Sequence, residues 1–261
     1  MNRKISFAEG EYYHIYCRGV EKRRIFLDDK DRKRFQSLLF LCNGTKPVIY
    51  RLVQGSTLYA TDVGKKIIAI GAYKLMPNHI HLLVKEISKG GITEFMRKIN
   101  TAYSMYFNKK YERVGPLFQG TFGAEHITRD EHLKYLFAYI HLNLIKLIEP
   151  NWKEEGIKNL KKAKKYLNDY CFSSYLSYCG KSSKEDILLS KKEFPNYFSR
   201  KYNFKDFINE WLMFKKIQGS TLYTIKSQKI RCPPAGFPAG GRCLSPILMI
   251  AFLSRRRLAE F

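Results

Sequence analysis

Apolar and polar residues alternate along the stretch Leu-Met-Pro-Asn-His-Ile-His-Leu-Leu-Val, which begins at residue 75. The run from Ile80 to Val84 is apolar and follows a Pro-Asn pair typical of a turn, so the pattern predicts a β-strand. Successive side chains of a strand point to opposite faces, so His79 and His81 share one face while Ile80 and Leu82 share the other. Two imidazoles on Cα atoms about 6 to 7 Å apart are close enough to bind one metal ion.

A packing role is the other interpretation of these histidines. A single histidine in a strand is more often a packed side chain with satisfied hydrogen bonds than a metal ligand. Two neighbouring buried imidazoles would each need hydrogen-bond partners, which makes packing a weaker explanation for the pair than for either residue alone. The pattern by itself leaves both interpretations open.

Strand and helix patterns alternate through the first 150 residues. Strands are predicted at 11–18, 48–53 and 66–73, ahead of the strand that carries the histidines. Amphipathic helices are predicted from about residue 28 to 42, from a Thr93 cap to about 107, and from about 130 to 148, after a capping-box spacing at Thr128 to Glu131. This order predicts an α+β fold with a small, largely antiparallel sheet and two principal helices on one face.

The chain changes in character after residue 150. Residues 151–216 are rich in lysine and predict a basic helical extension, a C-terminal lobe beside the domain of residues 8–150. The hexapeptide Gln-Gly-Ser-Thr-Leu-Tyr occurs twice, at 54–59 and 218–223, which is too short to define a solenoid repeat. A run rich in Pro and Gly follows the second copy, so residues 217–261 are predicted to form a separate, flexible tail.

The net charge points to a class of partner. The chain has 47 Lys and Arg against 23 Asp and Glu, a net charge of +24. Such a field attracts polyanions, so nucleic acid is the leading partner class and an anionic membrane surface the weaker one. The six cysteines form no C-x-x-C pair and no apolar run is long enough to span a bilayer, which predicts a cytoplasmic protein with reduced thiols and no membrane anchor.

A third ligand and a reacting group are expected from another element. In the run Tyr-Ile-His-Leu-Asn, Tyr139 and Asn143 are four residues apart and share one helical face with Tyr135 and Lys146. A phenol beside a side-chain carbonyl offers a nucleophile and an oxygen ligand on one rigid element. His141 projects elsewhere and is expected to be structural. The chain has eighteen tyrosines, so such a pair would also occur by chance.

Three motifs together resemble one family. They are His-Ile-His after Met-Pro-Asn, the loop Leu-Phe-Gln-Gly at 117–120, and Tyr-Ile-His-Leu-Asn on a helix. The combination resembles the single-tyrosine HUH transposases, in particular the group of REP-associated tyrosine transposases, over roughly residues 8–216. The resemblance implies a ferredoxin-like or RRM-like antiparallel sheet with the histidines on a central strand, and it makes residues 8–150 the catalytic domain.

The resemblance also implies a reaction. His79 and His81, with Asn143 as third ligand, would hold a divalent metal ion, Mg2+ or Mn2+. Tyr139 would attack a phosphorus atom of the DNA and form a 5′-phosphotyrosine, leaving a free 3′-hydroxyl. The implied partner is single-stranded DNA with hairpins, such as repeat or element ends. The implied protein is a prokaryotic, nucleoid-associated monomer or homodimer.

Basic side chains are the candidates for contacts with DNA, although each could equally be a solvated surface charge. The candidates are Arg18, Arg23, Arg24, Lys109, Lys110 and Arg113, with Gln119 to read or position a nucleotide. The chain departs from the family pattern at Leu144, where proline is common, and at Thr121 and Gly123, where basic residues are common.

Two other functions stay open at this point. A decayed or domesticated relative would bind hairpin nucleic acid without cutting it, which the departures at Thr121 and Gly123 favour. A metal-dependent phosphodiesterase would keep the histidines and use Tyr139 only for packing. A covalent adduct between protein and DNA would distinguish the transposase from both.

Overall fold

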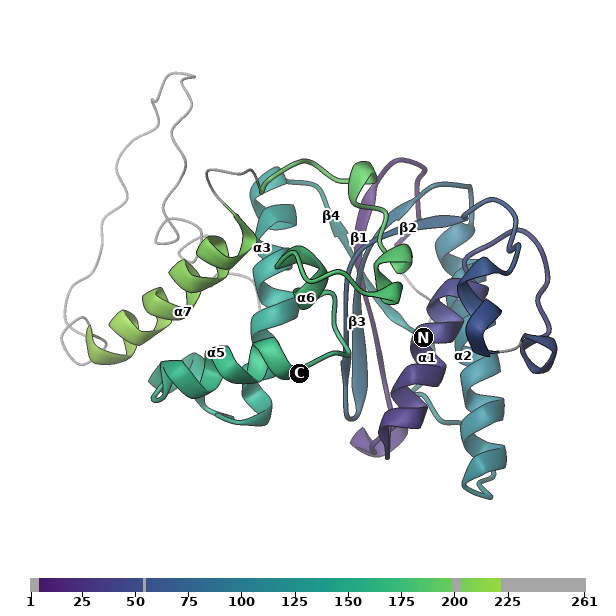
Figure 1. Cartoon of the computed structure of the whole chain (residues 1–261), viewed down its shortest axis with the longest axis horizontal. Coiled ribbons are helices and arrows are strands. Elements are labelled where there is room, and N and C mark those ends of the chain that lie inside the picture. The colour runs from purple at the N-terminus through teal and green to yellow at the C-terminus, as the bar shows by residue number, and fades with distance from the viewer. Residues whose placement is uncertain (1–4, 54, 199–202, 222–261) are drawn as a thin grey trace.

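The computed structural model describes residues 5–53, 55–198 and 203–221 of the chain. Residues 12–127 fold as a βαββαβ unit, in which two helices connect the strands of one antiparallel sheet (Figure 1). The strands are β1 (Tyr12–Arg18), β2 (Ile68–Met76), β3 (His79–Glu86) and β4 (Gly123–Ile127), in the order β2-β3-β1-β4. β1 and β3 are therefore central, and the predicted ferredoxin-like α+β fold is confirmed.

Two strand predictions differ from the structure. The segment 48–53 is not a strand, because Ile49 and Leu52 point into solvent and the segment turns through the 3-10 helix η2 (Tyr50–Leu52). The strand β4 was not predicted, because its sequence Gly-Ala-Glu-His-Ile has no apolar run. Backbone pairing with β1 along one edge of the sheet makes this segment a strand.

The two faces of the sheet carry different helices. The helices α1 (Asp29–Leu41) and α2 (Gly91–Lys110) cover one face, and α3 (Asp130–Leu142) covers the other (Figure 1). Tyr13, Ile15 and Cys17 of β1 are buried in the core under α1 and α2, whereas Leu83 of β3 is buried in the core under α3. The two principal helices predicted on one face are thus α1 and α2.

The helix ends differ in detail from the prediction. α2 begins after Gly90, whose φ of 77° places it in the left-handed region, and Thr93 lies inside the helix. No side chain caps α3, so the predicted capping box at Thr128 is wrong. Acidic residues in its first turn, Asp130 and Glu131, instead interact with the helix dipole. α3 ends at Leu142 and continues as the 3-10 helix η4 (Asn143–Leu147).

A β-bulge at Gly71 sets which residues of β2 face α3. The register of β2 against β3 shifts between Ile70 and Ala72. Ile70 packs in the core under α1 and α2, while Ala72 packs in the core under α3. The bulge therefore reverses the alternation, and Lys74 comes to share a face with its β3 partner His81.

The basic extension packs on α3, and its apolar side chains share a core with the sheet. The extension contains the helices α4 (Trp152–Glu155), α5 (Leu160–Asp169), α6 (Tyr175–Tyr178) and α7 (Phe204–Thr221), and the 3-10 helices η5 (Lys184–Leu188) and η6 (Lys191–Glu193). Two further 3-10 helices, η1 (Val20–Lys22) and η3 (Gly55–Ala60), lie earlier in the chain. Leu167, Phe194 and Trp211 are buried in the same core as Leu83. The boundary at residue 150 stays a prediction.

The predicted tail, residues 217–261, lies outside the described residues apart from the end of α7. In the part of the chain that is described, no helix combines the length and the apolar character needed to cross a membrane.

A buried carboxylate joins α1 to α2. Asp31 is fully buried and accepts hydrogen bonds from Lys110 Nζ at 2.6 Å, from Tyr111 Oη at 2.8 Å and from the Leu27 N–H at 2.8 Å. Burial alone would raise the pKa of Asp31, but the bonds from Lys110 and Leu27 outweigh burial and the pKa lies below its ordinary value. Lys110 also pairs with Asp28 at 2.8 Å. A charge predicted to contact DNA thus holds two helices together.

We expect Asp31→Asn to lower the free energy of unfolding by about 2 kcal/mol at pH 7, because Lys110 loses a buried partner. The pKa of Asp31 is depressed in the folded state, so its contribution is present above the ordinary value of 3.8 and is lost as the pH falls through the lower folded value. Urea unfolding should therefore show the gap between wild type and variant closing below pH 3.8. The control is Asp29→Asn on the exposed side of α1, and equal losses in both variants would contradict the account.

Candidate active site

Polar side chains gather on the sheet face that lies under α3. In an antiparallel sheet, residues directly opposite each other share a face. Tyr16 is opposite His81 and Arg18 is opposite His79, while His14 is opposite Glu125 on the other neighbouring strand. The polar residues of this face are His14, Tyr16 and Arg18 of β1, Lys74 of β2, His79 and His81 of β3, and Glu125 of β4.

The structure brings the two predicted ligands together. The ring centroids of His79 and His81 are 4.9 Å apart. His79 Nδ1 lies 2.6 Å from Asn78 Oδ1, and Asn78 Nδ2 donates to the Lys22 carbonyl at 3.2 Å. Because the second bond fixes the amide orientation, His79 Nδ1 must carry the proton and Nε2 the lone pair. The turn residue before the strand therefore sets the tautomer of His79.

Burial and positive charge keep His79 neutral. Burial is the main cause that lowers its pKa to about 3, and the cations Lys74, Arg18 and Lys146 lower it further. A neutral imidazole is the form that binds a metal ion, so His79 is in the binding form throughout the physiological pH range.

A third histidine, from β1, contacts the second ligand. His14 Nε2 lies 2.8 Å from His81 Nδ1, and the two rings stack with centroids 5.0 Å apart. Both side chains are buried, and burial is the main cause that lowers the pKa of His14. His14 was not among the predicted site residues. The available signal was the alternation of Tyr12, His14, Tyr16 and Arg18 within one strand.

Tyr139 on α3 faces the histidines from the opposite layer. Its ring meets those of His14 and His81 edge to face, with centroid distances of 5.8 and 5.9 Å. Burial is the main cause that raises the pKa of Tyr139, and Glu125 raises it further. The phenol is therefore protonated at neutral pH. The fully buried Lys74 brings its Nζ to 5.9 Å from the centre of the Tyr139 ring.

Asn143 carries a buried oxygen that suits a metal ligand. Its side chain is 5% exposed, and its Oδ1 has no hydrogen-bond partner among the described residues. A buried polar atom of this kind costs free energy unless another group satisfies it. Two imidazole nitrogens and an amide oxygen are a donor set that fits a divalent cation. No group of three or more His, Cys, Asp or Glu residues suited to a metal occurs in the described ranges. The set of His79, His81 and Asn143 is not such a group, because its third member is an amide.

His141 has the structural role expected of it. It is fully buried, its Nδ1 lies 2.6 Å from the Phe137 carbonyl oxygen, and its Nε2 lies 2.8 Å from Ser174 Oγ. Both ring nitrogens are thus used: Nδ1 bonds within α3, and Nε2 joins α3 to the segment before α6.

Two of the predicted DNA-binding residues lie at the end of β1 that is beside the histidines. Arg18 is directly opposite His79, and its charge contributes to the low pKa of His79. The Gln119 N–H donates to the Arg18 carbonyl at 2.8 Å, and Phe118 forms an isolated bridge with Gly19. The Leu-Phe-Gln-Gly loop therefore runs along the end of β1.

The remaining candidates for DNA contacts lie outside the sheet face that carries the histidines. Arg113 donates through Nη1 to Asn108 Oδ1 at 2.7 Å, and the neighbouring charge of Arg23 adds to the burial that lowers the pKa of Arg113. Arg24 and Lys109 are exposed. These four residues, Arg23, Arg24, Lys109 and Arg113, stay candidates for DNA contacts.

Packing leaves no room for a side chain at Gly123, where the resemblance leads us to expect a basic residue. A Cβ atom at this position would lie 2.1 Å from Tyr16 Cε2 and 2.3 Å from Tyr16 Cζ. The ring of Tyr16 therefore lies against the backbone of β4, and any larger residue would displace it. Tyr16 is in turn 5.6 Å from His14 and 6.4 Å from His81 between ring centroids.

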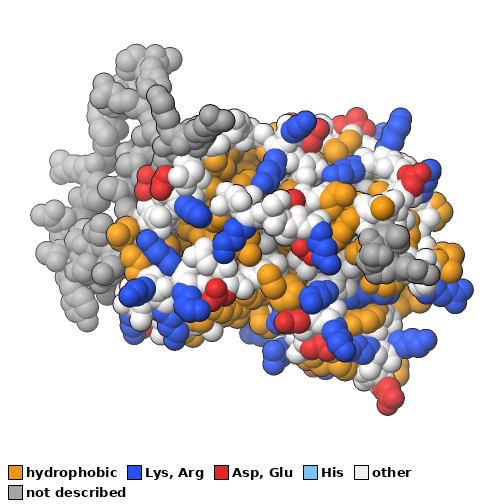
Figure 2. Space-filling view, in the orientation of Figure 1, with side chains coloured by type: hydrophobic (Ala, Val, Ile, Leu, Met, Phe, Trp, Pro, Cys, Tyr) orange, Lys and Arg blue, Asp and Glu red, His pale blue; other side chains and the backbone are white. Residues whose placement is uncertain are grey.

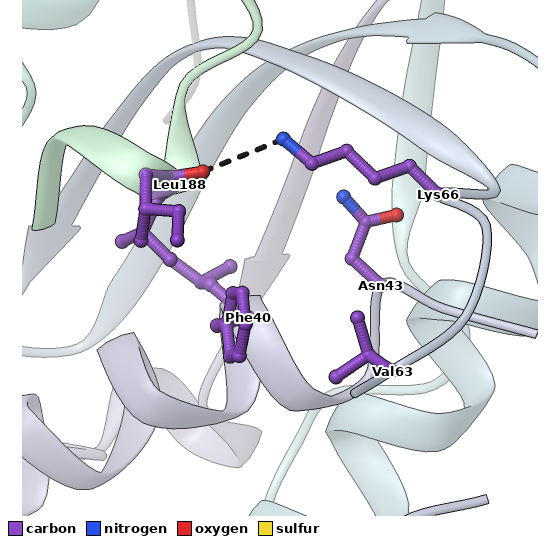
Figure 3. Close-up of a pocket in the computed structure, with 7 residues that line it drawn as sticks. Phe40, Asn43, Val63, Lys66 and Leu188 are labelled. Atoms are coloured by element: carbon purple, nitrogen blue, oxygen red, sulfur yellow. Dashed lines mark hydrogen bonds between the residues drawn. The ribbon is translucent and has the colours of Figure 1, made fainter. Parts of the chain in front are cut away.

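A separate small hollow lies away from this face (Figure 3). It is lined by Leu39, Phe40, Asn43, Val63, Lys66, Ile187 and Leu188. Its polar groups bond within the fold, since Asn43 Nδ2 donates to the Ile68 carbonyl at 3.0 Å and Lys66 Nζ donates to Ser190 Oγ at 3.1 Å. It shares no residue with the histidine face, which remains the candidate active site.

Comparison of the chain with known proteins identifies a family. A family model described as IS200-like transposase matches residues 9–143, just over half of the chain, and this range includes both histidines, Tyr139 and Asn143. Among solved structures, the chain is similar to a REP-associated tyrosine transposase bound to a REP hairpin, with 11% identity and a TM-score of 0.44 over 76% of this chain and 91% of the other. No curated protein matches the chain.

We expect Gly123→Ala to lower the free energy of unfolding by about 1 to 3 kcal/mol, because the added methyl group forces the Tyr16 ring from its place. A double-mutant cycle with Tyr16→Ala, followed by urea unfolding, measures the contact directly. Removing the ring should make Gly123→Ala nearly neutral. If the alanine costs the same with and without the ring, the close approach of Tyr16 to β4 is not the cause.

Proposed function

We propose a reaction for this chain, which belongs to the IS200-like transposase family. The reaction is metal-dependent cleavage and rejoining of single-stranded DNA through a covalent bond to Tyr139. The observation that carries this proposal is the meeting of two elements: Tyr139 on α3 lies against the imidazole of His81 on β3, with 5.9 Å between ring centroids. A nucleophile and a pair of metal ligands are thereby close enough to act on one phosphate.

We propose that His79, His81 and Asn143 hold the metal ion, Mg2+ or Mn2+. Support comes from the neutral state of His79, whose pKa burial lowers to about 3, and from the buried Asn143 Oδ1. The bound ion would polarise the scissile phosphate and stabilise the negative charge that develops on it. Two imidazole ligands suit Mn2+ somewhat better than Mg2+.

Tyr139 supplies the nucleophile in this proposal. Its phenol gives up its proton as the oxygen attacks the phosphorus atom, a new P–O bond forms to the tyrosine, and the bond to the 3′ oxygen breaks. The leaving strand ends in a 3′-hydroxyl after taking up a proton, and the DNA 5′ end stays on the protein as a phosphotyrosine. Because the number of phosphate ester bonds is conserved, a second 3′-hydroxyl can reverse the step and rejoin strands without ATP.

The net charge supports a nucleic-acid substrate. The chain carries a net charge of +24, and Lys and Arg side chains are spread across the face seen in Figure 2. Such a surface favours phosphate backbones irrespective of sequence. We propose single-stranded DNA with hairpins as the substrate, with Arg18 beside the reacting phosphate and Gln119 next to it in the loop that runs along the end of β1.

The alternative is a relative that binds hairpin DNA without cutting it. One observation favours this alternative: burial raises the pKa of Tyr139, so the phenol is a weak nucleophile unless it is activated. A covalent adduct is the product that separates the two functions.

We expect the purified protein to form a covalent adduct with labelled single-stranded hairpin DNA from the flanks of its own gene when Mn2+ or Mg2+ is present. A denaturing gel would show the adduct as a shifted band. Tyr139→Phe should reduce the rate of adduct formation by about 10⁴-fold or more, because phenylalanine lacks the oxygen that forms the bond to phosphorus.

The matched control is Tyr135→Phe, one helical turn earlier and 6.0 Å from Tyr139 between ring centroids. It should leave the adduct in place. If wild type and Tyr139→Phe both bind the hairpin DNA tightly and neither forms an adduct, the result would favour a protein that binds hairpin DNA without cutting it. Metal-dependent cleavage that survives Tyr139→Phe would identify a phosphodiesterase instead.

A further inference from the structure

We infer that His14 and Glu125 are positioning residues that hold the His81 imidazole in the tautomer with its lone pair on Nε2, ready to bind a metal ion. The inference rests on the proposed function, because it assigns a task to two residues that support a proposed metal ligand. Neither residue belongs to the three motifs that carry the family resemblance.

The first step is the hydrogen bond between the two imidazoles. His14 Nε2 and His81 Nδ1 are 2.8 Å apart, a normal distance for a hydrogen bond that contains one proton. Both side chains are 5% exposed, and such burial favours the neutral form of an imidazole over the charged form. A neutral imidazole has one donor and one acceptor nitrogen. The proton lies on one side of this bond, and its position fixes the tautomers of both residues.

Glu125 decides on which side the proton lies. It is directly opposite His14 in the pairing of β1 with β4, and its Oε2 is 3.9 Å from His14 Nδ1. This contact is too long for a direct hydrogen bond, but a glutamate carboxylate is ionised at neutral pH, and its negative charge lies nearest to Nδ1 of the His14 ring. An ionised acceptor favours the His14 tautomer with its proton on Nδ1.

The tautomer of His81 then follows. With the His14 proton on Nδ1, His14 Nε2 can only accept, so the proton between the rings belongs to His81 Nδ1. The lone pair of His81 is therefore on Nε2, and a metal ion that binds this ring binds through Nε2. A chain of carboxylate, imidazole and ligating imidazole orients the ring and raises its basicity, as outer partners do in metal sites.

The other proposed ligand reaches the same state by a separate route. His79 Nδ1 donates to Asn78 Oδ1 at 2.6 Å, which leaves its lone pair on Nε2. Two unrelated partners, an amide on the preceding turn and a histidine on the neighbouring strand, thus give His79 and His81 the same tautomer. Both rings would therefore bind a metal ion through Nε2.

The second oxygen of Glu125 also has a histidine neighbour. His132 of α3 brings Nε2 to 4.0 Å from Glu125 Oε1. The carboxylate therefore lies between the sheet and α3, with one oxygen nearer to each histidine. This arrangement keeps Oε2 on the side of His14.

The test measures Mn2+ affinity and the His81 tautomer, and neither measurement depends on DNA cleavage. Electron paramagnetic resonance of free Mn2+ gives the affinity of wild type, His14→Leu, His14→Gln and the control His126→Leu. His126 lies on β4 near the surface and pairs with Glu11 at 2.9 Å. We expect His14→Leu to weaken Mn2+ binding by about 10- to 100-fold. His14→Gln should restore most of the affinity, because its side-chain oxygen can accept the same proton, and His126→Leu should match wild type.

Two results would overturn the inference in different ways. Wild type that binds no Mn2+ would overturn it together with the proposed metal site. Equal Mn2+ affinities of wild type and His14→Leu would overturn the inference alone and leave the proposed function standing. If His14→Leu does not fold, 15N NMR of wild type without metal decides the matter: a His81 proton on Nδ1 supports the inference, and a proton on Nε2 contradicts it.

Discussion

The pairing of β1 with β3 at the centre of the sheet is the constraint on which the candidate site depends. Its register sets Tyr16 opposite His81, and a slip by one residue would move every side chain of β1 to the other face. Tyr13 and Ile15, fully buried under α1 and α2, make such a slip costly. The apolar core on one face of the sheet therefore fixes the positions of the polar side chains on the other face, including the histidines.

Local spacing was enough to predict part of the geometry of the candidate site. The two-residue period of a strand predicts that His79 and His81 share a face, and the four-residue spacing on a helix relates Tyr139 to Asn143. Strand order and register are not local, so the sequence could not show that His14 would lie between His81 and Glu125. For the same reason β4 was missed, since its five residues become a strand only by pairing with β1.

The positions of the charged residues in the fold could not be predicted from the sequence either. The sequence establishes the net charge of +24 but not which cations are engaged within the fold. Lys110 pairs with Asp31, a residue 79 positions away, whereas Arg18 lies opposite His79 at the candidate site. Lys74 became part of the site because a bulge at Gly71 reversed the alternation of β2. Around His79, the nearby cations favour a neutral imidazole and an anionic phosphate at once, which is the combination that the proposed reaction needs.

The most direct test of this account is the location of Mn2+ in a crystal of the protein soaked with the ion, from its anomalous scattering. The account predicts one peak shared by His79 Nε2, His81 Nε2 and Asn143 Oδ1, on the side of the sheet that faces Tyr139. A peak bound through Nδ1 of either histidine, or Mn2+ bound only elsewhere on the protein, would contradict it.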